Sequence, residues 1–271
     1  MRRAARLLLF ISVLAPMTAK AAPGFLVVID AGHGGADRGA TVHEGGRLIA
    51  EKELTLRLAL ATAQELRAHG IRVVLTREED RDVALTERTA LANRLGAQVF
   101  LSLHMNSAAD GKSGEGVETY ILNGSSDKAS RRLADLENAV LTGSVARGHA
   151  ATDVSLIIKD LLIDGNLTDS KRLACAVQGQ LVHGAHSGAR NRGVRQALFY
   201  VLLGADMPSA LVEAGFLDNP KDRHRLMDTR SRRELAKAIA QAVLSFRDTR
   251  RNGRHDGRVA SMRGLGTCLV R

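Results

Sequence analysis

Aromatic side chains are scarce in this sequence. Its 271 residues include no tryptophan, two tyrosines and six phenylalanines. Proteins that bind single-stranded nucleic acids stack the bases on aromatic rings, and this composition offers little from which to build such a surface. The net charge of +10 does not supply one either, since residues 1–21 contribute +4 and residues 248–271 another +4, which leaves +2 for the body between them. We therefore expect no nucleic-acid partner.

Long apolar runs are also lacking. No stretch of the sequence approaches the ~20 apolar residues that a transmembrane helix needs. The N-terminus instead reads as a signal peptide over residues 1–21, because three arginines precede a short apolar run over 7–15 and Ala19-Lys20-Ala21 supplies a small-x-small cleavage site. The pattern predicts export, with no stable membrane span after cleavage.

Cysteine is limited to Cys175 and Cys268. An exported chain allows the two to form a disulfide. Cys175 lies in an apolar helical stretch, however, whereas Cys268 lies in a basic tail, residues 248–271, that has no periodicity and that we expect to be disordered. Such a tail would have to be pinned for the two sulfur atoms to meet. We therefore expect two unpaired thiols.

The body of the chain, residues 22–247, alternates runs rich in valine, isoleucine and leucine with longer stretches of helical periodicity. This alternation is typical of βα units and predicts a single α/β domain, a mostly parallel sheet flanked by helices. Strands are expected at 25–30, 71–76, 98–103, 116–122, 197–203 and 209–213, and helices at 51–69, 85–95, 168–186 and 231–246.

Residues 124–169 break the alternation. The run Gly124-Ser125-Ser126-Asp127 is typical of a helix start, and an apolar stripe follows at helical spacing, formed by Ala129, Leu133, Leu136 and Val140. A turn-rich patch over 143–152 and a second apolar helix over 154–162 complete the segment. Because it is longer than a crossover between strands requires, we interpret it as a helical insertion.

Four side chains suited to metal chemistry stand at the ends of expected elements. His33 follows the first strand, Glu51 opens the first helix, and His104 and Glu213 end later strands. Ligands in open α/β sheets bind at the carboxyl ends of the strands, so the spacing predicts one shared site. Two histidines and one carboxylate with an open fourth position form a catalytic zinc set, which His33, Glu51 and His104 supply.

A zinc ion in such a set lowers the pKa of its bound water and polarises a carbonyl. A separate base must then take the proton of that water and return it to the leaving amine, and Glu213 is placed for this role. Each residue also has an ordinary interpretation: a lone histidine after a strand is more often a hydrogen-bonding group, Glu51 would be a favourable charge at a helix N-terminus, and Glu213 could pair with an arginine such as Arg195. Only the combination predicts a metalloenzyme.

Three ordered motifs carry a resemblance to a known family: Ile29-Asp30-Ala31-Gly32-His33-Gly34-Gly35, Ser102-Leu103-His104-Met105-Asn106 and Leu211-Val212-Glu213-Ala214-Gly215-Phe216-Leu217. With Glu51-Lys52 between the first two, they resemble the zinc-dependent N-acetylmuramoyl-L-alanine amidases of the bacterial cell wall. The resemblance implies a twisted sheet, a periplasmic location, and cleavage of peptidoglycan at the amide between N-acetylmuramic acid and L-Ala of the stem peptide. It also implies Zn²⁺ bound by His33, Glu51 and His104, with Glu213 as the catalytic carboxylate.

Two details qualify this resemblance. Met105 stands where the family usually carries a smaller residue, and we expect it to narrow the site. The insertion resembles the regulatory segment of the division amidases, in which a helix lies over the zinc site and a glutamate fills the open coordination position until a LytM-domain activator displaces it. Glu137 is the candidate for that glutamate, at roughly 70° from the centre of the apolar stripe, while Asp135 faces away. The ordinary interpretation makes Glu137 a solvated charge on an amphipathic helix.

Two other functions use the same residues. A zinc peptidase acting on stem peptides would need the same ligands but would cut a different bond. A non-catalytic wall-binding division protein could use the fold as a platform, although such a protein has no need of a base at Glu213. For the amidase we expect a monomer.

Overall fold

The computed structural model describes residues 24–108, 114–125, 127–139, 166–185, 189–256, 268 and 270. The expected signal peptide therefore lies outside the described residues, as do Val140, the turn-rich patch and the second insertion helix over 154–162. Within the described part of the chain, no helix is both long and apolar enough to cross a bilayer.

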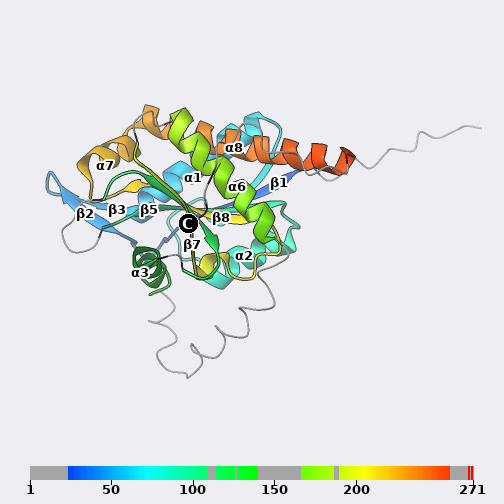
Figure 1. Cartoon of the computed structure of the whole chain (residues 1–271). Helices are drawn as coiled ribbons and strands as arrows, with labels where there is room; N and C mark the ends of the chain where they lie inside the picture. Colours follow the sequence, from blue (N-terminus) through cyan, green and yellow to red (C-terminus); the bar gives the residue numbers. More distant parts are fainter. Residues whose placement is uncertain are drawn as a thin grey trace, which may run out of the picture.

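A sheet forms the centre of the molecule (Figure 1). It has six strands in the order β4-β1-β5-β8-β6-β7. Four of the five strand pairs are parallel, and only β6 and β8 run antiparallel. The predicted mostly parallel sheet is thus confirmed. The strands are β1 (Leu26–Ala31), β4 (Arg72–Leu75), β5 (Val99–Asn106), β6 (Val117–Leu122), β7 (Asn191–Ala197) and β8 (Ser209–Phe216).

Helices cover both faces of the sheet because its central strands are apolar on both sides. Every residue of β1 is buried, as expected for a parallel strand between two helical layers. Val27 and Ile29 pack into one apolar cluster, and Leu26 and Val28 into another. The first face carries α1 (Glu51–Ala68), α6 (Leu167–Gln180) and α8 (Thr229–Asp256), and the second carries α2 (Leu85–Arg94) and α3 (Lys128–Glu137) (Figure 1).

The prediction of a strand over 197–203 is wrong. The strand in this region is β7, which ends at Ala197, and a short 3-10 helix over Tyr200–Leu202 follows it. The apolar side chains Phe199, Val201 and Leu202 are buried, but they fill the second cluster from that turn and not from a strand. Since β7 is an edge strand with mostly polar residues, it carried no apolar run to reveal it.

A β-hairpin and a short helix were also not expected. A hairpin joins β2 (Thr41–Glu44) to β3 (Arg47–Ala50) through Gly45 and Gly46, which both have positive φ angles of 58° and 78°. Such a two-residue turn favours glycine because both positions lie in the left-handed region. Helix α7 (Pro220–Met227) follows β8, with Asn219 as its N-cap.

The C-terminal tail is tied to the body. Helix α8 continues to Asp256, beyond its expected end near Phe246. Cys175 of α6 forms a disulfide with Cys268, with the two Cα atoms 5.9 Å apart, and Val270 pairs with Val194 of β7 as an isolated parallel bridge. The expectation of two unpaired thiols is therefore wrong. The sequence could not indicate that the chain end returns to the sheet edge beside α6.

Breaking this disulfide is expected to lower the free energy of unfolding by about 3–4 kcal/mol, because the bond closes a loop of 93 residues and restricts the unfolded chain. The Cys268→Ser variant, measured by urea unfolding, tests this loss. Reducing agent should lower the stability of the unmodified protein to the same level and leave the variant unchanged. Equal stability of both proteins under oxidising conditions would contradict the expectation.

A buried ion pair fixes the end of β1. Asp30 is fully buried and accepts hydrogen bonds from Arg88, Thr76 and Ser102 at 2.6–2.7 Å. Burial alone would raise the pKa of Asp30, but the Arg88 guanidinium and the two hydroxyls outweigh it and lower the pKa below 3.8. Arg88 also donates to the carbonyl oxygen of His33 at 3.2 Å. The network therefore holds the backbone from which His33 projects.

Replacing Asp30 by Asn is expected to lower the free energy of unfolding by about 3–5 kcal/mol, because Arg88 would keep a buried charge without its partner. As the pKa of Asp30 is depressed in the folded state, its contribution is complete above pH ~4 and is lost as the pH falls further. Urea unfolding at neutral pH measures the effect. Asp248→Asn, at an exposed ion pair with Arg247, should change stability by less than ~0.5 kcal/mol, and equal losses in both variants would contradict this account.

Candidate metal centre

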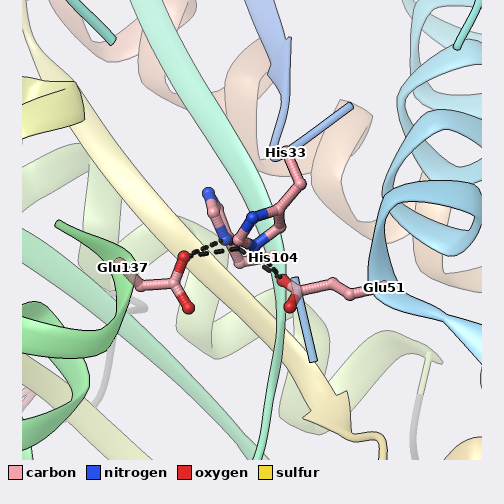
Figure 2. A group of neighbouring side chains, drawn as sticks. All are labelled: His33, Glu51, His104 and Glu137. Atoms are coloured by element: carbon pink, nitrogen blue, oxygen red, sulfur yellow. Dashed lines mark hydrogen bonds and ion pairs between the residues drawn. The ribbon is translucent and has the colours of Figure 1, made fainter. Parts of the chain in front are cut away.

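Four side chains from four elements meet at the carboxyl end of the sheet. Figure 2 shows His33, Glu51, His104 and Glu137 pointing toward one another. His33 follows β1, Glu51 is the first residue of α1, His104 lies in β5, and Glu137 is the last residue of α3. One nitrogen or oxygen atom from each residue lies within 4.8 Å of the other three.

The distances place two imidazole nitrogens against two carboxylate oxygens. His33 Nε2 is 3.1 Å from Glu51 Oε1 and 3.2 Å from Glu137 Oε2. His104 Nδ1 is 3.1 Å and 2.9 Å from the same two oxygens. Although they are buried, His33 Nε2 and Glu137 Oε2 form no hydrogen bond with any described residue. Buried polar atoms without such partners are rare. Two of them that face the same point as His104 Nδ1 and Glu51 Oε1 fit a cation with nitrogen and oxygen ligands.

Neighbouring groups orient these side chains. His33 Nδ1 lies 2.8 Å from Asp37 Oδ2, so that Nε2 is left facing the centre. Glu51 accepts backbone hydrogen bonds from Ala40 and Met105, both at 2.9 Å. Metal-binding histidines commonly have such a carboxylate behind them. The sequence alone did not reveal the support that Asp37 gives to His33.

Two glycines leave space for the ligands. A Cβ atom at Gly32 would lie 2.4 Å from His104 Nε2, and one at Gly39 would lie 2.6 Å from Glu51 Oε2. Gly39 also has a φ of 63°, and His33 itself has a φ of 60°, a conformation that few residues other than glycine adopt. The loop after β1 therefore brings the backbone close to the ligands at a conformational cost.

Electrostatics within the cluster favour positive charge. Burial lowers the pKa of His104, but the facing carboxylates of Glu137 and Glu51 outweigh it and raise the pKa to about 10. The pKa of His33 is likewise raised well above 6.5 against burial, by Glu51, Asp37 and Glu137. The two carboxylates therefore attract protons to the imidazoles, and a divalent cation would compete for the same nitrogens.

Glu213 lies beside this cluster, in β8 and in register with His104 of β5. Its side chain is fully buried, and neither carboxylate oxygen has a hydrogen-bond partner among the described residues. Burial raises the pKa of Glu213 well above 4.5, and the nearby carboxylates of Glu137 and Glu51 add to the shift. The ordinary interpretation of Glu213 as a partner of Arg195 does not hold.

Helix α3 is rotated from the expected orientation. Its buried residues are Ser130, Leu133 and Ala134, whereas Leu136 of the expected stripe is 52% exposed. Glu137 continues the buried face at helical spacing, with a side chain only 11% exposed, so the interpretation as a solvated charge is also wrong. The apolar stripe in the sequence did not show which face of α3 is buried. The adjacent face carries Ser130 and Ala134, and these small residues pack in the interior as well as larger apolar groups do.

Met105 does not narrow the site. It is buried in the apolar cluster that contains α1 and α6, on the opposite face of β5 from His104, as alternation along a strand requires. The expected narrowing is wrong for this reason.

A family comparison decides what kind of protein this is. Residues 27–245 match the family model of the N-acetylmuramoyl-L-alanine amidases. The chain belongs to this family. The match begins at the second residue of β1 and includes the rest of the sheet, all four clustered residues and Glu213.

Named relatives agree with the family match. The amidase is 32% identical over 239 residues to N-acetylmuramoyl-L-alanine amidase AmiA of Escherichia coli K12, an alignment covering 85% of this chain and 79% of the relative. It is 36% identical over 231 residues to AmiC of Neisseria meningitidis, covering 83% of this chain and 53% of that longer protein.

Solved structures confirm the fold. The N-acetylmuramoyl-L-alanine amidase of Clostridium difficile 630 matches with a TM-score of 0.63 at 30% identity, covering 83% of this chain and 98% of the other. AmiC2 of Nostoc punctiforme matches with a TM-score of 0.61 at 31% identity, covering 83% and 97%. The α/β fold and the enzyme class predicted from the sequence are both confirmed.

Proposed function

We propose that this amidase cleaves the amide between the lactyl group of N-acetylmuramic acid and L-Ala of the stem peptide, using a zinc ion held by His33, Glu51 and His104. The observation that carries the proposal is the convergence of these three donors beside Glu213, which is buried and has no hydrogen-bond partner in the part of the chain that the structure describes. A bound Zn²⁺ would polarise the lactyl carbonyl and lower the pKa of a water molecule.

Glu213 moves the proton in this reaction. Its carboxylate accepts a proton from the attacking water and then delivers it to the L-Ala nitrogen, so that the amide carbon gains the hydroxyl and the nitrogen gains the hydrogen. A carboxyl group with a raised pKa, and with no hydrogen-bond partner among the residues that the structure describes, can hold a proton between the two steps.

We also propose that Glu137 inhibits the enzyme. Its Oε2 atom lies within 3.2 Å of both histidine nitrogens, where a fourth ligand of the zinc ion would stand. A carboxylate at that position excludes the attacking water, so the rate depends on the fraction of molecules in which α3 is displaced. A LytM-domain protein is the class of activator that we propose for this displacement.

The remaining parts of the proposal concern organisation. Residues 1–21 act as a signal peptide for export to the periplasm, residues 22–247 form the catalytic domain with a regulatory insertion over 124–169, and the enzyme is a monomer. The basic composition of the N-terminus and its short apolar run support export.

Digestion of purified sacculi tests the bond that is cleaved. We expect intact stem peptides that begin with a free L-Ala amine, together with glycan strands stripped of peptide. Peptides shortened from within would identify the zinc peptidase instead. Binding to sacculi without any product would identify a non-catalytic wall protein.

Replacing Glu137 by Ala is expected to raise activity without an activator. If the closed state holds about 99% of the molecules, the rate should rise by up to ~100-fold. Release of stem peptides from sacculi measures the change. Asp135→Ala serves as the control, since Asp135 lies on the exposed face of the same helix, and an equal rate in both variants would return Glu137 to a structural role.

A further inference from the structure

A row of side chains leads from the candidate metal centre to the edge of the sheet. Across three adjacent strands, His104 is in register with Glu213, and Glu213 with Glu118. Residues directly opposite each other on paired strands point to the same face of a sheet. The next position in the row, on edge strand β7, is Gly193, and a Cβ atom there would meet nothing within 4 Å.

An irregularity in β7 brings an arginine to this row. The register between β6 and β7 shifts from Val117 opposite Asn191 to Glu118 opposite Gly193, which leaves Arg192 as an extra residue. Gly193 has a φ of 86°. Such bulges occur next to active sites, where they redirect a side chain.

The redirected Arg192 is held on two sides. Its Nε donates to Glu118 Oε2 at 2.8 Å, and its guanidinium carbon lies 4.9 Å from the centre of the Phe216 ring. Its two terminal nitrogens have no partner among the described residues. A stacked guanidinium with both terminal nitrogens available is suited to binding a carboxylate through two parallel hydrogen bonds.

A second arginine already binds a carboxylate here. Arg195 lies 3.3 Å from Glu118 Oε2 and also pairs with Asp127, the N-cap of α3. Asp127 is 44% exposed and belongs to the helix whose displacement the proposed function requires. When α3 is displaced, Asp127 leaves with it, and Glu118 is the only acidic partner left to Arg192 and Arg195 among the described residues. The three side chains together then carry one excess positive charge.

We propose that Arg192 and Arg195 recognise a substrate carboxylate on the amine side of the scissile amide, and that Asp127 occupies this position while α3 is in place. The amine side is chosen because of the order of the row. Glu213 protonates the leaving amine, and Arg192 and Arg195 lie beyond Glu213 as seen from His104. The inference rests on the proposed function and specifies its substrate as a peptide that carries a free carboxylate beyond the residue with the scissile nitrogen.

An ion-pair network that merely stabilises the sheet edge would contain the same contacts. The two roles differ in their dependence on the substrate, because a stabilising role is indifferent to the charge of the peptide. The test therefore uses two soluble muramoyl peptides, one with free carboxylates on the stem and one with those carboxylates converted to amides. All enzymes carry Glu137→Ala, so that displacement of α3 does not limit the rate.

The parent enzyme should prefer the free carboxylate, and Arg192→Gln or Arg195→Gln should raise KM for that substrate about tenfold with little change in kcat. Neither variant should alter KM for the amidated peptide. Arg192→Lys, which retains the charge but not the bidentate geometry, should recover part of the loss. Arg230→Gln is the control, because Arg230 is 89% exposed on α8 and pairs with Glu234.

Two results would overturn the inference. One is equal hydrolysis of both peptides by the parent enzyme, and the other is an equal loss on both peptides in the arginine variants, which would assign these residues to structural support. Failure of the parent enzyme to cleave either peptide would contradict the proposed function itself, and is thereby distinguished from an error in the assignment of the carboxylate site.

Discussion

Replacing Glu213 by Gln is expected to lower kcat on peptidoglycan by about 10³-fold, a typical contribution of a positioned general acid and base. The amide keeps the shape of the side chain but cannot take the proton of the attacking water. Because neither oxygen of Glu213 has a hydrogen-bond partner among the described residues, the substitution breaks no contact there. The rate of stem-peptide release from sacculi, measured in the Glu137→Ala background, gives the effect free of inhibition.

The substitution should leave the metal and the fold intact. We expect the zinc content of the Glu213→Gln variant to match that of the parent, and its thermal midpoint to be unchanged or higher, since an uncharged group replaces a buried acid. Turnover close to that of the parent, with zinc in place, would remove Glu213 from the mechanism. Loss of zinc along with activity would instead make Glu213 part of the metal centre.

Replacing His104 by Ala is expected to abolish both zinc binding and turnover. A zinc site with three protein ligands loses most of its affinity when one ligand is removed. The purified variant should therefore contain only a small fraction of one zinc ion per chain. Metal analysis and stem-peptide release measure the two effects. His183→Ala, at an exposed position after α6, should retain both, and full zinc content in the His104 variant would contradict the proposed ligand set.

Zinc affinity should also depend on pH. With the pKa of His104 raised to about 10 and that of His33 raised well above 6.5, protons occupy these nitrogens at neutral pH in the metal-free protein. Zinc must displace them, so its apparent affinity should rise with pH until both nitrogens have lost their protons. Competition with a chromogenic chelator between pH 6 and pH 9 would measure this rise.

The central strands were predictable because burial on both faces leaves a mark in the sequence. β1, β5 and β8 are fully buried, so their valine, leucine and isoleucine runs cannot be mistaken for surface. Edge strand β7 has only two buried residues, Val194 and Ala197, and was therefore missed. The apolar run after β7 was mistaken for a strand, because a buried 3-10 turn uses the same types of apolar residue as a buried strand.

The candidate site likewise contains residues that the sequence predicted and residues that it did not. His33, His104 and Glu213 stand at the ends of predictable strands, so their convergence followed from the topology of a parallel sheet. The rotation of α3 did not follow, since it depends on which of two similar faces packs better. Arg192 could not be anticipated either, because its direction depends on an extra residue in β7 that only the pairing with β6 defines.

The bridge between Val270 and Val194 has a consequence for solubility. β7 is one of the two outermost strands of the sheet, and outermost strands present unpaired backbone groups on which a second molecule can add its own strand. A chain end anchored by Cys268 blocks part of that template. Loss of the covalent anchor would therefore favour association of molecules into continuous sheets as well as unfolding of each one.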